Sequence, residues 1–76
     1  MREKRECTVI TFDTTAAAIA MEKLCLAHGL PGRLIPVPRS LSADCGMAWC
    51  APPEAREVLE NAPGHPEYAG VYTILV

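Results

Sequence analysis

The chain is short and slightly acidic, which limits what it can do. Its 76 residues fit one domain, and a domain of this size buries only about 60% of the surface that its unfolded chain exposes, so a deep substrate pocket is not expected. Seven Lys and Arg against nine Asp and Glu give a net charge of -2, which argues against nucleic acid as a partner. The longest apolar run, residues 16–21, is too short to cross a membrane or to act as a signal sequence. We expect one soluble cytoplasmic domain over residues 1–76.

The first half of the chain predicts a strand followed by a helix. Residues 1–6 are nearly all charged and indicate a solvated lead-in, whereas Cys7–Phe12 is rich in β-branched residues and predicts a strand. Residues 13–15 supply side-chain oxygens that cap a helix start. The good helix formers that follow predict a helix over 15–28, with Gly29 at its C-terminal cap.

The middle of the chain predicts two further strands. Arg33–Val37 is a strand interrupted by Pro36, and Pro38 follows directly, so the missing N–H donors favour an edge position in the sheet. Residues 38–45 predict a loop or short turn, and Met47–Ala51 predicts a third, short strand.

The last third completes the pattern. A proline pair, an early glutamate and apolar residues at helical spacing predict an amphipathic helix over 53–62, and residues 71–76 predict a final strand. The order β-α-β-β-α-β is that of the split βαβ, or ferredoxin-like, fold in the α+β class. We therefore expect a four-stranded antiparallel sheet with two helices on one face.

Alternation along the third strand places its side chains on two faces. Ala48 and Cys50 share one face, and Met47 and Trp49 share the other. If the small pair lies under the helices, Trp49 lies on the open face and could form a noncatalytic interaction or dimerisation surface. The equal alternative is that Trp49 simply caps the sheet beside Phe12 or Tyr72.

Three of the four cysteines are predicted to be structural. Cys7 and Cys50 belong to strands that are central neighbours in a ferredoxin-like sheet, and we expect both to be buried as small apolar residues. Cys25 shares a helical stripe with Ala18 and Met21, which indicates core packing.

A metal centre is not indicated by the spacing of these residues. The chain has no CxxC motif, and His28 and His65 show no regular ligand spacing to the cysteines. His65 is interpreted as a loop residue. We expect no bound metal and no cofactor.

Cys45 differs from the other three cysteines. It lies in a polar segment, and Gly46 directly after it leaves its approach sterically open. Arg39 in the same loop would lower the pKa of a nearby thiol, whereas Asp44 would raise it. We therefore predict an accessible thiol at Cys45, and the alternative is a solvent-facing cysteine without a role.

The segment GRLIPVPRSLSADCG, together with VITFDTT, Glu22-Lys23 and CGMAW, resembles the selenium/sulfur (Se/S) carrier protein-like family over nearly the whole chain. The resemblance implies a small ferredoxin-like domain whose cysteine carries sulfur or selenium, and it places that cysteine at Cys45. It also matches Gly46, and it matches the family's proline-arginine pair to Pro38 and Arg39. An arginine often follows the family's CG by four residues, and here that position is Cys50.

The leading hypothesis is therefore a carrier that holds sulfur or selenium as a persulfide or selenopersulfide on Cys45. Because no nearby His, Glu or Lys is suited to general base work, the loop favours a carrier over a stand-alone enzyme. Its partners would be donor and acceptor proteins, and a homodimer is left open. The alternative is the interaction module centred on Trp49. RNA binding is remote, because the aromatic RNA-recognition run is missing.

Overall fold

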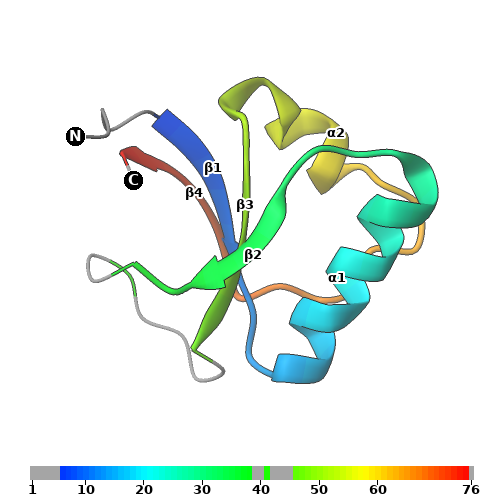
Figure 1. The fold of residues 1–76 in the computed structure, drawn as a ribbon, viewed down its shortest axis with the longest axis horizontal. Helices are drawn as coiled ribbons and strands as arrows, with labels where there is room; N and C mark the ends of the chain where they lie inside the picture. Colours follow the sequence, from blue (N-terminus) through cyan, green and yellow to red (C-terminus); the bar gives the residue numbers. More distant parts are fainter. Residues whose placement is uncertain (1–5, 39–40, 42–45, 76) are drawn as a thin grey trace.

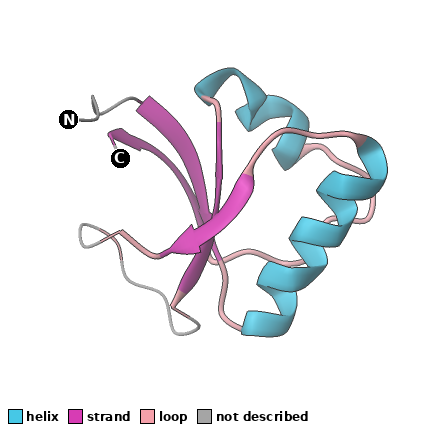
Figure 2. Ribbon diagram, in the orientation of Figure 1, coloured by secondary structure: helices cyan, strands magenta, loops and turns pink. Residues whose placement is uncertain are grey.

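The computed structural model describes residues 6–38, 41 and 46–75, and within them the elements follow the predicted order (Figure 1; Figure 2). The elements are β1 (Glu6–Thr11), α1 (Thr15–His28), β2 (Arg33–Pro36), β3 (Met47–Ala51), a 3₁₀ turn η1 (Pro53–Ala55) that leads into α2 (Arg56–Glu60), and β4 (Gly70–Leu75).

The described strands form one antiparallel sheet in the order β2-β3-β1-β4. Strand β2 lies at an edge, as the prolines predicted. Both helices lie on the same face of the sheet, and no helix of the described residues covers the other face (Figure 1). The predicted ferredoxin-like split βαβ arrangement is therefore confirmed.

Helix α1 begins and ends where its capping residues predicted. The Thr14 hydroxyl accepts a hydrogen bond from the Ala17 N–H at 3.1 Å, which satisfies a free donor of the first turn. Gly29 adopts the left-handed conformation with φ of 64°, and its N–H bonds back to the Cys25 carbonyl. Between these caps the helix buries the predicted stripe of Ala18, Met21 and Cys25.

The second helix is shorter than the predicted span of 53–62. Prolines cannot donate backbone hydrogen bonds, and the segment opens as a 3₁₀ turn in which the Ala55 N–H bonds to the Pro52 carbonyl at 3.0 Å. At the other end Asn61 leaves the helical conformation, and its side-chain amide donates to the Glu57 carbonyl at 2.8 Å. Regular α-helix is therefore limited to Arg56–Glu60.

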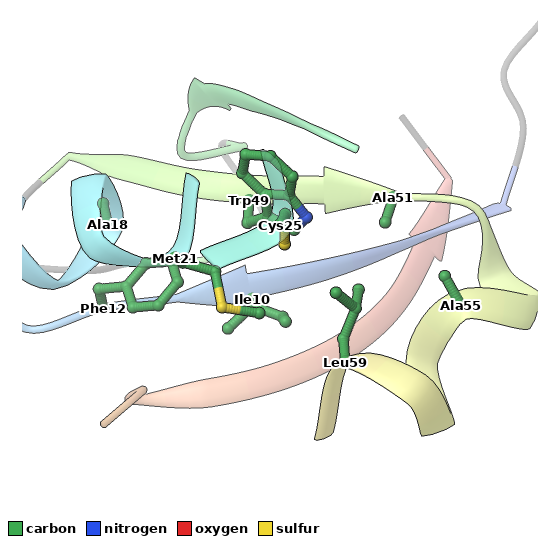
Figure 3. Close-up of a cluster of buried hydrophobic side chains, with 9 residues drawn as sticks. All are labelled: Ile10, Phe12, Ala18, Met21, Cys25, Trp49, Ala51, Ala55 and Leu59. Carbon is green, nitrogen blue, oxygen red and sulfur yellow. The ribbon is translucent and has the colours of Figure 1, made fainter. Parts of the chain in front are cut away.

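The main hydrophobic cluster lies between the helices and the sheet (Figure 3). Its buried members are Ile10, Phe12, Ala18, Met21, Cys25, Trp49, Ala51, Ala55 and Leu59. They come from both central strands and from all the described helical segments, so this layer joins distant parts of the chain.

Trp49 belongs to this cluster and is only 2% exposed. Figure 3 shows its indole beside Cys25 of α1, on the helix-covered side of the sheet. Gly32 makes room for the ring, because a Cβ there would lie 2.6 Å from Trp49 Cε2. The hypothesis of an open-face interaction surface centred on Trp49 is therefore wrong, and the expectation that the small pair of Ala48 and Cys50 could lie under the helices fails with it.

Candidate functional site

The predicted carrier loop joins β2 to β3, and the structure describes where it begins and ends. The Val37 N–H donates to the Gly46 carbonyl at 3.0 Å. This hydrogen bond extends the pairing of β2 and β3 by one residue on each strand beyond Pro36 and Met47. Two of the three predicted site residues, Cys45 and Arg39, lie outside the described residues. The third, Gly46, is described, and it holds the end of the loop to the edge strand.

Gly46 is exposed and has a backbone that few other residues would adopt. Its φ is 73°, in the left-handed region that glycine enters at no steric cost. Apart from its two chain neighbours, no described residue places an atom within 4 Å of the position that a Cβ would occupy. The residue directly after Cys45 therefore adds no side chain of its own to the approach.

Cys25 lies in the core, as predicted from its helical stripe. It is 1% exposed, and burial raises the pKa of its thiol. Both effects oppose attack on another protein's sulfur, because the thiolate is the nucleophile and must reach its target.

Cys7 and Cys50 are only half-buried, so the prediction of two buried apolar residues is wrong for both. Cys50 pairs with Val9 across β1 and β3, which places Cys7 diagonally next to Cys50 on the face away from the helices. The neighbouring Cys7 side chain also raises the pKa of the Cys50 thiol. The sequence had predicted neighbouring strands for these cysteines, but only the register brings the two thiols together.

The surroundings of Cys50 favour its protonated form. Burial, the hydrogen bond to Cys7 and the charge of Cys7 raise its pKa to about 11. Arg33, its direct partner on β2, acts in the opposite direction but does not outweigh these effects. Cys50 therefore keeps its proton at neutral pH.

A cavity of about 740 Å³ lies beside this thiol pair. Its lining residues are Glu6, Cys7, Gly32, Arg33, Cys50, Ala51, Pro52, Pro53 and Glu54. It occupies the end of the sheet where β1 and β2 begin and β3 ends, opposite the end that holds Gly46. The thiol pair and Gly46 therefore lie at opposite ends of β3.

The remaining candidate groups do not assemble into a larger centre. Among the described residues, no three His, Cys, Asp or Glu side chains are grouped so that they could hold a metal ion. His65 lies in the connection before β4, with its ring 5.4 Å from that of Tyr68. The described helices are all too short or too polar to cross a membrane.

Comparison with known proteins gives one match. A family model described as "Putative Se/S carrier protein-like" matches residues 6–70, which span β1 to the start of β4. No curated protein and no solved structure matches the chain.

Proposed function

The chain belongs to the Se/S carrier protein-like family, and we propose that it carries sulfur or selenium on Cys45 and passes it between partner proteins in the cytoplasm. The carried atom would be held as a persulfide or selenopersulfide. Gly46 supplies the observation that supports this proposal best, because it is exposed and left-handed, and no described residue beyond its chain neighbours lies within 4 Å of its Cβ position. A carrier thiol has to enter another protein's active site, and a glycine beside it removes one source of steric hindrance.

The transfer balances as a thiol exchange. The Cys45 thiol attacks the outer sulfur of a donor persulfide, so that R–S–SH and Cys45–SH become R–SH and Cys45–S–SH. The sulfur of the donor's thiol leaves with the bonding electron pair and takes up the proton. An acceptor thiol then repeats the same exchange on the outer sulfur of Cys45, and selenium would follow the same steps.

Arg39 is proposed to stabilise the terminal anion of the adduct. A persulfide or selenopersulfide is negatively charged when deprotonated, and a guanidinium in the same loop offsets that charge. Catalysis stays with the donor and acceptor proteins, because the sequence of this loop has no His, Glu or Lys for general base work.

Two of the other three thiols support Cys45 as the carrier by their own surroundings. Cys25 is buried, and Cys50 holds its proton well above neutral pH. Neither is suited to the exchange as the first nucleophile.

The test is incubation of the wild type with a cysteine desulfurase and cysteine, or with a selenocysteine lyase and selenocysteine, followed by intact mass measurement. We expect the wild type to gain one sulfur or selenium and Cys45→Ser to gain none. A hydroxyl is less acidic and less polarisable than a thiol, and it does not form the adduct. Cys25→Ser is not a suitable control, because Cys25 lies in the core and a buried hydroxyl would destabilise the fold. Cys50→Ser is the matched control and should load like the wild type. Loading of Cys45→Ser at the wild-type level would overturn the proposal.

A second variant examines the role of Arg39. Arg39→Ala should load normally but lose the adduct faster, since an exposed cation stabilises a nearby anion by only about 0.5–1 kcal/mol. The half-life of the adduct, followed by mass over time, measures this. An unchanged half-life would remove Arg39 from the site while leaving Cys45 in it.

A further inference from the structure

Cys7 and Cys50 form a pair of thiols that the proposed carrier function does not use. They lie on the two central strands and share one face of the sheet as diagonal neighbours. Both line the cavity of about 740 Å³, so a small solute can reach them.

Their register does not favour a direct disulfide. Diagonal neighbours in an antiparallel pair have Cα atoms about 7–8 Å apart, whereas disulfides need about 4.4–6.8 Å. Both cysteines are free in the structure. An atom placed between the two sulfurs would span the longer separation without moving the central strands.

The ligand set selects which atom this could be. Thiolate sulfur is a soft ligand that favours Cu(I), zinc and iron-sulfur clusters. Structural zinc and iron-sulfur sites need about four ligands, and the described residues supply no third metal-binding side chain to this pair. Cu(I) accepts two thiolates in a linear arrangement, so the pair alone completes its coordination.

The charges around the cavity agree with a monovalent cation. Glu6 and Glu54 line the cavity and would attract a cation. Two thiolates and one Cu(I) carry a net charge of -1, and Arg33 stands directly opposite Cys50 on β2 to offset it.

We propose that Cys7 and Cys50 form a two-coordinate site for a soft monovalent metal ion of the Cu(I) type. Binding converts Cu⁺ and two thiols into a Cys7–S–Cu–S–Cys50 anion and releases two protons, with no change of oxidation state. The site is independent of the carrier proposal, because Cys45 takes no part in it.

The experiment titrates reduced, full-length protein with Cu(I) held by a chromophoric Cu(I) chelator under anaerobic conditions. Wild type and the matched control Cys45→Ser should each withdraw one Cu(I) per chain and release two protons in weakly buffered solution. Cys7→Ser and Cys50→Ser should fail to withdraw it while keeping the wild-type circular dichroism. Arg33→Met should lower the affinity by about two- to fivefold, the effect of an exposed charge.

X-ray absorption on the copper-loaded wild type provides a measurement that needs no variant. Two sulfur ligands and no nitrogen or oxygen ligand are expected. The proposal is overturned if the wild type withdraws no Cu(I), if Cys45→Ser loses the ion, or if copper is bound by three or more ligands or in a cluster between chains. Since Cys45→Ser should lose the chalcogen adduct and keep Cu(I), failure of one proposal is distinguishable from failure of the other.

Discussion

The two ends of strand β3 place cysteines in opposite surroundings. At its start, Gly46 is exposed, no described residue beyond its chain neighbours lies within 4 Å of its Cβ position, and Cys45 comes directly before it in the sequence. At its end, Cys50 is half-buried, diagonal to Cys7 and paired with Arg33. The backbone beside Cys50 is also tightly packed, because a Cβ at Gly32 would lie 2.7 Å from the Cys50 carbonyl oxygen.

The surroundings of a cysteine set the reactivity of its thiol. Burial and the neighbouring Cys7 raise the pKa of Cys50 and keep its thiol protonated at neutral pH, whereas the glycine that follows Cys45 is exposed and left-handed.

The largest loss of unfolding free energy is expected from Gly32→Ala, next to the end of β3 that holds Cys50. Gly32 has φ of 128°, where a Cβ is strained, and the new methyl group would overlap both the Trp49 ring and the Cys50 carbonyl. Strain and overpacking together should lower the free energy of unfolding by about 3 kcal/mol. Gly46→Ala at the open end should cost only about 1 kcal/mol, from its left-handed backbone alone.

Urea unfolding of the two variants measures this difference. Equal losses of unfolding free energy in Gly32→Ala and Gly46→Ala would mean that the two ends of β3 are packed alike. The contrast between a packed Cys50 and an open Gly46 would then fail.

A moderate effect is expected from the proton on Cys50. Its pKa is raised from 9.0 to about 11 in the folded protein, so the folded state binds this proton more tightly than the unfolded state. The resulting stability is fully present below pH 9 and is lost as the pH rises to about 11. The wild type should therefore lose more stability over this window than Cys50→Ser.

Urea unfolding at neutral pH and through that alkaline window gives the comparison, and the difference between the two proteins cancels the titration of lysines and tyrosines. Parallel pH profiles for both proteins would show that Cys50 is not held in its protonated form.

The smallest effect is expected at the surface near the packed end. Arg56 forms an exposed ion pair with Glu60 at 2.7 Å and donates to the Thr73 hydroxyl at 3.1 Å, which links α2 to β4. Because exposed pairs are weak, Arg56→Ala should cost about 0.5 kcal/mol, and Glu60→Gln should cost less because the contact to Thr73 remains. A loss above about 2 kcal/mol, measured by the same urea unfolding, would show that this link is a main support of the packed end.

The fold could be predicted wherever a local signal fixes the backbone. Thr14 and Gly29 cap α1 by side-chain and left-handed geometry, and both bounds of that helix were correct. The end of α2 could not be predicted, because Asn61 bonds to its own helix only in the folded chain and the helix has no side-chain cap at its start.

The faces of β3 could not be predicted for a different reason. Alternation separates Ala48 and Cys50 from Trp49, but both sets are apolar enough to face a core, so the pattern does not say which set the helices cover. The answer depends on space supplied by Gly32, a residue on another segment. The contact between Cys7 and Cys50 likewise depends on the register of two strands, whereas the open backbone at Gly46 follows from its identity.

The most direct test of the contrast is the order in which the four cysteines react in native protein. We would expose the folded, reduced chain to a small alkylating reagent at neutral pH and map the modified peptides by mass over time. We predict that Cys45 is modified well before Cys7 and Cys50. The buried Cys25 should react no faster than Cys7 or Cys50. Equal rates at all four cysteines, or modification of Cys50 ahead of Cys45, would contradict it.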